Sequence, residues 1–213
     1  MAEPARLYLM TPTIADAQAF APLLAQVCAS GNVAAVLIDL PRDDERSTIN
    51  RIKCLAPIVQ ERGAALLVTA SPQAAVRGGA DGVHLSGADP ATLRDATGTL
   101  QPDRIVGVGA LSLRHDAMVA GEVDVDYVMF GEPRADGFVP DVEATVERAA
   151  WWAELFAVPC VAYAAQLDAV PLLASTGAEF VALGDAVFNA PEGPAAAVAR
   201  ACDLLAGAET VLR

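Results

Sequence analysis

Four carboxylates each follow a short apolar segment of this 213-residue chain: Asp39, Asp89, Glu132 and Asp185. Carboxylates that converge bind a divalent cation or a cationic ligand, and a carboxylate in a cleft can transfer protons. Aspartate also often caps the start of a helix, and Asp89, directly before Pro90, suits that role, as does Asp185 in a short turn. Both interpretations stay open until the elements that carry these residues are considered.

Apolar segments alternate with longer segments of helical periodicity along the whole chain. Phe20, Leu23, Leu24 and Val27, for example, fall at positions i, i+3, i+4 and i+7 on one face of a helix. The apolar segments are continuous rather than alternating, which is typical of a parallel sheet covered on both faces. We therefore predict eight strands, each followed by a helix, with the strands at residues 6–10, 34–40, 64–70, 82–86, 104–110, 127–133, 159–165 and 180–184.

Two segments share the same order of parts, namely a small-residue turn, a short apolar strand and an acidic helix start. Gly79–Pro90 and Gly177–Phe188 begin 98 residues apart and contain the fourth and the eighth predicted strand. A duplicated half-barrel gives this separation, whereas an open sheet has no reason for it. The predicted fold class is therefore α/β, a single-domain (βα)8 TIM barrel over residues 1–213, with a doubly wound open sheet as the alternative.

In barrels of this kind, reacting groups lie at the carboxyl ends of the strands and in the loops that follow. Polar residues occupy several of these ends: Thr11, Thr13, Asp39, Arg42, Thr69, Ser86, Asp89, Glu132, Arg134, Tyr163, Gln166 and Asp185. Small residues occupy others: Gly109, Ala164, Ala165 and Gly184. They either let the backbone approach a phosphate or simply form tight strand-to-helix turns.

The two histidines and the two tryptophans favour structural roles. His84 lies in the middle of a strand, with its side chain on the opposite face from its neighbours, so a hydrogen-bonded structural histidine is favoured over a catalyst. His115 is expected to face solvent. Trp151 and Trp152 are adjacent on one helix and cannot both face the core, so one of them marks a candidate homodimer surface.

Charge and composition exclude several classes of partner. The chain has 27 acidic against 14 basic residues, and a net charge of −13 repels nucleic acid and anionic membranes. No apolar segment approaches the roughly 20 residues of a membrane span, and no secretory signal is recognisable. The four cysteines lack CxxC spacing and suit reduced thiols, so we expect a cytoplasmic protein.

Four segments between Ala64 and Phe188 carry a resemblance to a known family: GADGVHLSGAD, IVGVGALS, VDVDYVMFGEP and VPCVAYAAQLDAVPLLASTGAEFVALGDAVF. In order and spacing they resemble the thiamine phosphate synthase family, which includes the thiazole tautomerases. The resemblance implies a TIM barrel. It also implies one of two activities: a transferase that joins a pyrimidine pyrophosphate to a thiazole phosphate with Mg²⁺ and releases pyrophosphate, or an isomerase of the thiazole phosphate.

Carried over residue by residue, the resemblance indicates an incomplete synthase site. The family's Asn-Asp pair after the third strand falls on Thr69 and Ala70, and its second metal aspartate is retained as Asp89. The serine after the fifth strand falls on Gly109. The histidine through which the tautomerases transfer protons falls on Glu132.

The phosphate-binding elements of the family are also replaced. Its Thr-Lys loop after the sixth strand becomes PRADGFVP, which leaves Arg134 as the nearby cation. Its Gly-Gly pair falls on Ala164 and Ala165, and its last serine falls on Gly184 or Asp185. The Gln-x-Arg-x-Lys signature after the second strand becomes IDLPR, where Asp39 and Arg42 are the nearest polar candidates.

We therefore predict Glu132 as the catalytic residue and Asp89 as a ligand of Mg²⁺. The predicted substrate-binding residues are Asp39, Arg42, Thr69, Gly109, Arg134, Ala164, Ala165, Gly184 and Asp185. The predicted function is to bind or convert a phosphorylated thiamine precursor, either thiazole phosphate or pyrimidine pyrophosphate. The alternative is a catalytically inactive paralogue that works as a small-molecule binding or regulatory protein.

Overall fold

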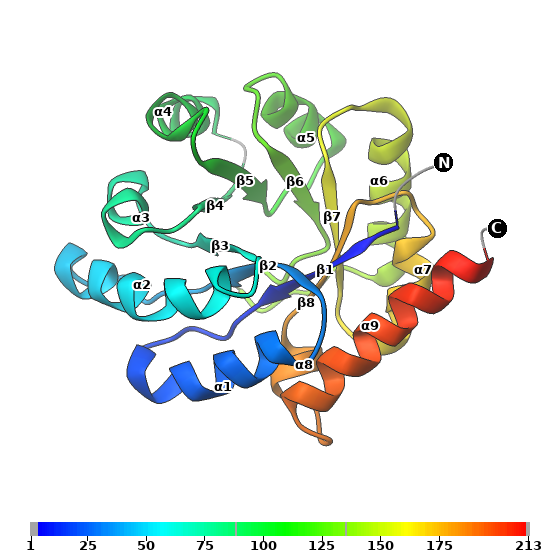
Figure 1. Cartoon of the computed structure of the whole chain (residues 1–213). Helices are drawn as coiled ribbons and strands as arrows, with labels where there is room; N and C mark the ends of the chain where they lie inside the picture. Colours follow the sequence, from blue (N-terminus) through cyan, green and yellow to red (C-terminus); the bar gives the residue numbers. More distant parts are fainter. Residues whose placement is uncertain (1–3, 88, 135, 212–213) are drawn as a thin grey trace.

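The eight strands of the computed structural model close into one parallel barrel, in which β8 pairs with β1 (Figure 1). The structure describes residues 4–87, 89–134 and 136–211, so the ends of the predicted 1–213 span lie outside it. The strands are β1 (Arg6–Met10), β2 (Val33–Ile38), β3 (Ala65–Val68), β4 (Gly82–Ser86), β5 (Ile105–Gly109), β6 (Tyr127–Phe130), β7 (Cys160–Ala164) and β8 (Phe180–Leu183). The predicted TIM barrel is confirmed, and the open sheet is excluded because no strand of the barrel is an edge strand.

A ring of helices surrounds the strands in Figure 1. These helices are α1 (Ala17–Ala29), α2 (Glu45–Gln60), α3 (Pro72–Gly78), α4 (Pro90–Leu100), α5 (Arg114–Gly121), α6 (Val142–Leu155), α7 (Val170–Ala174), α8 (Asp185–Phe188) and α9 (Pro194–Val211). A 3₁₀ turn, η1 (Leu167–Ala169), precedes α7. The sequence predicted one helix after β8, whereas the structure has two. Pro191 has no amide hydrogen to continue α8, so α9 begins as a separate helix.

Alternate residues of each strand enter two different apolar layers. In β1, Leu7 and Leu9 pack outward against the helices, while Tyr8 points into the barrel. The barrel interior is filled by Tyr8, Ala35, Leu37, Leu67, Tyr127, Met129, Val161, Tyr163 and Ala182. Because both faces of the strands are covered, the strands are continuously apolar in sequence.

Acids at the amino-terminal ends of three strands tie each strand to the one before it. Each accepts a hydrogen bond from a backbone N–H: Asp81 from Leu66 (2.7 Å), Asp126 from Val106 (2.7 Å) and Glu179 from Cys160 (2.8 Å). Asp81 and Glu179 occupy the same position, the third, in the two similar segments of the sequence. The shared acid therefore has a structural reason, since it satisfies a backbone donor at the bottom of the barrel.

We expect Asp81→Ala to lower the free energy of unfolding by about 1–3 kcal/mol, because it leaves the Leu66 amide without its acceptor. The change also removes an acceptor of the Gln60 side chain, 3.1 Å away. Urea unfolding monitored by circular dichroism measures the loss. Asp95→Ala, at an exposed position on α4, is the control and should change stability by less than about 0.5 kcal/mol. Equal losses in the two variants would contradict the proposed role of Asp81.

The histidine outside the barrel, the two tryptophans and the four cysteines lie as the sequence predicts. His115 is exposed, Trp152 is fully buried and Trp151 is half-buried. Cys28, Cys54, Cys160 and Cys202 are all free thiols. Among the described residues, every helix is too short or too polar to cross a bilayer.

Candidate functional site

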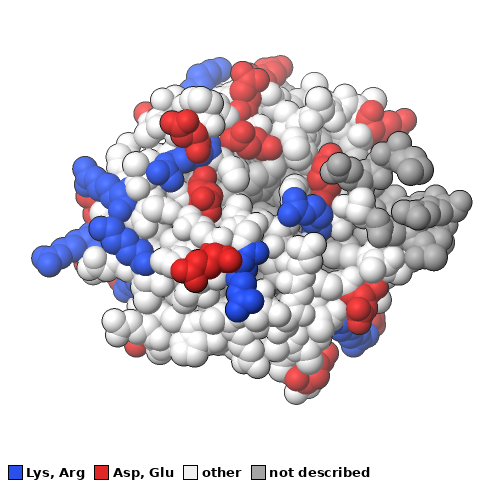
Figure 2. All heavy atoms as spheres, viewed as in Figure 1, with Lys and Arg blue, Asp and Glu red and all other residues white. Residues whose placement is uncertain are grey.

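A cavity of about 900 Å³ opens at the carboxyl ends of the strands. Its polar wall includes Thr11, Thr13, Asp39, Arg42, Thr69, His84, Glu132, Arg134 and Asp185. On the face shown in Figure 2, acidic and basic side chains lie interspersed. The cavity is large enough for a small-molecule ligand and presents both acceptors and cations.

Most of the predicted site residues lie on this cavity. The lining contains Asp39, Arg42, Thr69, Glu132, Arg134, Gly184 and Asp185. They come from loops or strand ends that are far apart in the sequence, and barrel closure brings them together. Their roles in binding or catalysis remain predictions.

The other predicted residues lie elsewhere. Asp89 is exposed and caps α4, accepting the Thr92 amide at 2.9 Å, and hydrogen bonds from Thr92 lower the pKa of its carboxyl group. Ala164 packs outward in the layer between strands and helices. Ala165 lines a second cavity of about 310 Å³. Gly109 lies directly against Glu132, because a Cβ atom there would be 2.3 Å from the Oε2 atom of Glu132.

Asp39 follows β2, and three threonines hold it in place. The Thr13 hydroxyl donates to its Oδ2 atom, and the Thr69 hydroxyl donates to its Oδ1 atom over 2.8 Å. The Asp39 amide donates to the Thr11 hydroxyl oxygen over 3.1 Å. The carboxylate is therefore fixed on the cavity wall by residues that follow the two neighbouring strands, β1 and β3.

Glu132 enters the cavity because of the residue before it. Gly131 adopts φ +85°, a conformation that favours glycine, and a Cβ atom there would lie 2.4 Å from the Thr145 hydroxyl oxygen. Glu132 is only 6 % exposed, and its Oε2 atom lies 2.9 Å from Nε2 of His84. Glu132 is thus a buried acid that borders a ligand-sized cavity.

Two arginines supply positive charge at the cavity. Arg134 donates to the Ser112 hydroxyl over 3.0 Å, and its guanidinium lies 5.0 Å from the centre of the Phe138 ring. Arg42 is exposed, and no hydrogen bond or ion pair of its side chain occurs in the described part of the chain. Both guanidinium groups could bind an anion, since arginine matches phosphate geometry well.

Tyr163 separates the main cavity from the second one and lines both. Burial and, to a smaller extent, the charge of Asp185 raise its pKa to about 12. The phenol therefore stays protonated and is a hydrogen-bond donor between the two cavities.

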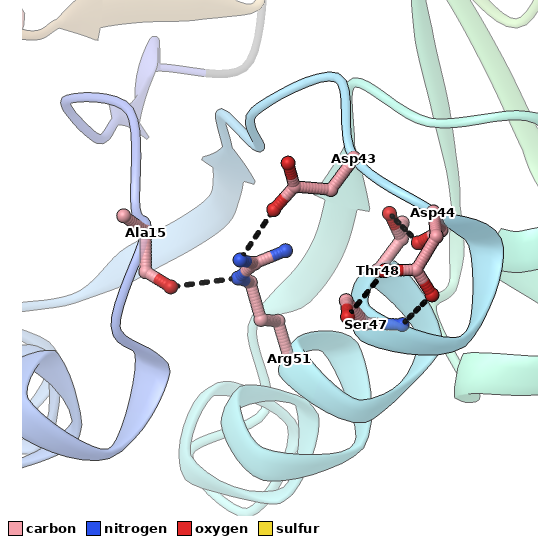
Figure 3. A network of polar contacts seen from close by, with 6 residues as sticks. All are labelled: Ala15, Asp43, Asp44, Ser47, Thr48 and Arg51. Atoms are coloured by element: carbon pink, nitrogen blue, oxygen red, sulfur yellow. Dashed lines mark hydrogen bonds and ion pairs between the residues drawn. The ribbon is translucent and has the colours of Figure 1, made fainter.

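Arg51 on α2 joins the two loops that carry Thr13 and Asp39 (Figure 3). Its Nε atom donates to the Ala15 carbonyl over 2.8 Å, and its Nη2 atom lies 2.6 Å from the Asp43 carboxylate. Asp44 caps the same helix by accepting the Ser47 amide. Sequence reasoning missed Arg51, because nothing in the sequence places its side chain between these loops.

We expect Arg51→Ala to lower the free energy of unfolding by about 1–3 kcal/mol, because the Ala15 carbonyl and Asp43 lose their shared donor. Thermal and urea unfolding measure the change. Arg46→Ala on the same helix is the matched control, since Arg46 is exposed and should affect stability by less than about 0.5 kcal/mol. If Arg51→Ala were as stable as Arg46→Ala, the contacts of Arg51 with Ala15 and Asp43 would not contribute to stability.

The expected Mg²⁺ would have few protein ligands gathered at one point among the described residues. In residues 4–87, 89–134 and 136–211, no three His, Cys, Asp or Glu side chains are placed to share one metal ion. Asp89, the predicted ligand, caps a helix and is absent from the described cavity wall. Mg²⁺ is commonly held by one or two carboxylates together with substrate phosphates, so Asp89 as a ligand of Mg²⁺ stays a prediction, and no catalytic step is routed through a metal.

Comparison with known proteins identifies the family. The family model for thiamine monophosphate synthase matches residues 7–187. The chain belongs to this family. It is 42% identical to the thiamine-phosphate synthase of Rhodospirillum centenum over 196 residues, which cover 91% of this chain and 94% of that protein. It is also 35% identical to the thiamine-phosphate synthase of Hyphomonas neptunium, over 91% of this chain and 90% of that protein.

A solved structure shares the fold. Thiamine phosphate pyrophosphorylase from Pyrococcus furiosus superimposes with a TM-score of 0.77 at 21% identity, over 95% of this chain and 96% of that chain. The resemblance read from the sequence is therefore confirmed for family and fold. The sequence did not predict the contacts of Glu132 in this protein, namely those with His84 and Gly109.

Proposed function

We propose that this protein binds a phosphorylated thiamine precursor in the main cavity and converts it with Glu132 as the proton-transfer group. One observation carries the proposal: Glu132 is a buried acid on the cavity wall, hydrogen-bonded to His84. Buried carboxylates in clefts are suited to acid–base chemistry. Family membership supports thiamine biosynthesis as the setting, with either synthase or tautomerase chemistry.

The charges around the cavity favour the vicinity of its arginines for the phosphate. Asp43 is paired with Arg51 at 2.6 Å and Glu45 with Arg77 at 2.9 Å, so neither faces the cavity as an uncompensated charge. Repulsion between a phosphate and the Asp185 carboxylate about 4 Å away would weaken binding by roughly 4 kcal/mol at an effective dielectric constant near 20. We therefore place the phosphate beside Arg42, after β2, or beside Arg134, after β6, and away from Asp185.

The alternative is a binding protein without turnover, and one observation favours it. Thr69 and Ala70 stand where the family resemblance implies an Asn-Asp pair whose aspartate would help to hold Mg²⁺. In that case the cavity would bind the precursor, and no product would form.

Two measurements test the proposal and separate it from the alternative. Thermal unfolding is followed with thiazole phosphate and with pyrimidine pyrophosphate, each with and without Mg²⁺. Mixtures of protein and substrates are then analysed for thiamine phosphate and for the isomerised thiazole. Stabilisation together with product supports the proposal, stabilisation without product supports the binding protein, and no stabilisation at saturating ligand overturns both.

A further inference from the structure

Four buried side chains form one continuous hydrogen-bonded column inside the barrel. The Tyr8 and Tyr127 hydroxyls are 2.9 Å apart, and the Tyr127 hydroxyl lies 2.8 Å from Nδ1 of His84. Nε2 of His84 lies 2.9 Å from Oε2 of Glu132. The column therefore runs from the interior of the barrel to the cavity, where His84 and Glu132 both line the wall and Glu132 is the last member.

The neighbouring strand β5 leaves room for this column. Gly107 pairs in register with both His84 and Tyr127, and a Cβ atom on Gly107 would lie 1.9 Å from the Tyr127 ring. Gly109 leaves room in the same way for the carboxylate of Glu132. The rings of His84 and Tyr127 can then stack across β5, with centroids 5.7 Å apart and planes inclined by 25°.

The hydrogen atoms of the column have one arrangement in which every donor is used. Burial raises the pKa of both phenols, Tyr8 and Tyr127, well above their ordinary values, so both keep their protons. If Tyr8 donates to Tyr127, then Tyr127 is free to donate to Nδ1 of His84. In the opposite direction, the Tyr8 hydrogen would have no acceptor among the described residues, which is costly for a buried hydroxyl.

We infer that Tyr127 holds His84 as the neutral tautomer protonated on Nε2, and that His84 in turn positions Glu132 by donating to its Oε2 atom. Within the described part of the chain, Oε1 of Glu132 has no hydrogen-bond donor, so it remains available to a ligand. His84 and Tyr127 are thus positioning residues that act through Glu132. Their effect on turnover rests on the proposed function, whereas the tautomer of His84 does not.

Nitrogen-15 NMR of histidine-labelled protein tests the tautomer directly. The chain has only two histidines, and His115→Gln assigns the signals because His115 is exposed. We expect the His84 signals of a neutral ring protonated on Nε2 at pH 7. A ring protonated on both nitrogens, or on Nδ1 alone, would overturn the inference.

Two variants extend the test along the column. Tyr127→Phe removes the donor to Nδ1 and should change the His84 signals, whereas Tyr8→Phe leaves that donor in place and should preserve them. If Tyr127→Phe does not fold, the wild-type spectrum and that of Tyr8→Phe still decide the tautomer. A Tyr8→Phe spectrum with the other tautomer would count against the inference.

Turnover provides the readout for positioning. With the product assay described above, Tyr127→Phe should lower kcat by up to about 100-fold and change KM by less than threefold, because Glu132 is misoriented while the cavity wall is intact. An unchanged kcat in an active enzyme would overturn the positioning role. If wild type gives the expected His84 signals and no product, the proposed function fails while the tautomer stands.

Discussion

Glu132→Gln is expected to lower kcat for the proposed conversion by about 100- to 10,000-fold, the usual contribution of a positioned acid–base group. The amide has nearly the same shape, and its oxygen can still accept the Nε2 hydrogen of His84. It cannot take up a proton as the carboxylate does. Stability should therefore change little while the rate falls, and steady-state kinetics together with thermal unfolding measure both quantities.

Controls for Glu132→Gln are available on the same chain. Glu143→Gln neutralises an exposed acid in the first turn of α6, and kcat should stay within about twofold of the wild type. Glu132→Asp keeps the charge but moves the carboxylate away from His84. Its kcat should therefore be lower than that of the wild type and higher than that of Glu132→Gln. A glutamine variant with wild-type kcat would exclude Glu132 as the proton-transfer group.

Trp152→Ala is expected to lower the free energy of unfolding by about 3–5 kcal/mol, the range for a large aromatic side chain in a core. Trp152 is fully buried, and its ring stacks on Phe156 with centroids 4.0 Å apart and planes inclined by 12°. Its indole N–H also donates to the Val158 carbonyl over 2.7 Å. The variant therefore loses packing and leaves a carbonyl without its donor.

The neighbouring residue is the control for this experiment. Trp151 is half-buried, and Arg114 lies over its ring at 4.8 Å. Trp151→Ala removes a cation–π contact of about 0.5–1 kcal/mol and part of a half-buried surface, so it should cost clearly less than Trp152→Ala. Denaturant unfolding of both variants gives the comparison, and a loss at position 151 as large as at 152 would contradict the assignment of the buried face.

Asp89 and Glu132 differ in how far the sequence around each residue explains its position. Its carboxylate accepts both the amide and the hydroxyl of Thr92, and this capping role needs only the local sequence. The position of Glu132, in contrast, depends on residues from other strands and turns: Gly131 turns the backbone, Gly109 leaves room for the carboxylate, and His84 lies 2.9 Å from its Oε2 atom. One local signal of this arrangement exists in the sequence. Gly107 and Gly109 alternate on the inward face of β5, which indicates that large side chains from neighbouring strands fill the space beside them.

The sequence by itself determined the barrel. Continuous apolar strands, amphipathic helices and strand ends with polar residues are local patterns, and each depends on residues that lie close together in the chain. They sufficed to predict that Asp39, Arg42, Glu132 and Arg134 would gather at one end of the strands, as they do.

Only the tertiary structure decided which of these side chains touch one another. His84 and Glu132 are 48 residues apart, Tyr8 and Tyr127 are 119 apart, and the register of the closed barrel brings each pair together. Arg51 reaches Ala15 across 36 residues in the same way. Contacts of this kind depend on strand register and on the space left by neighbouring residues, and neither is written in the local pattern of any one segment.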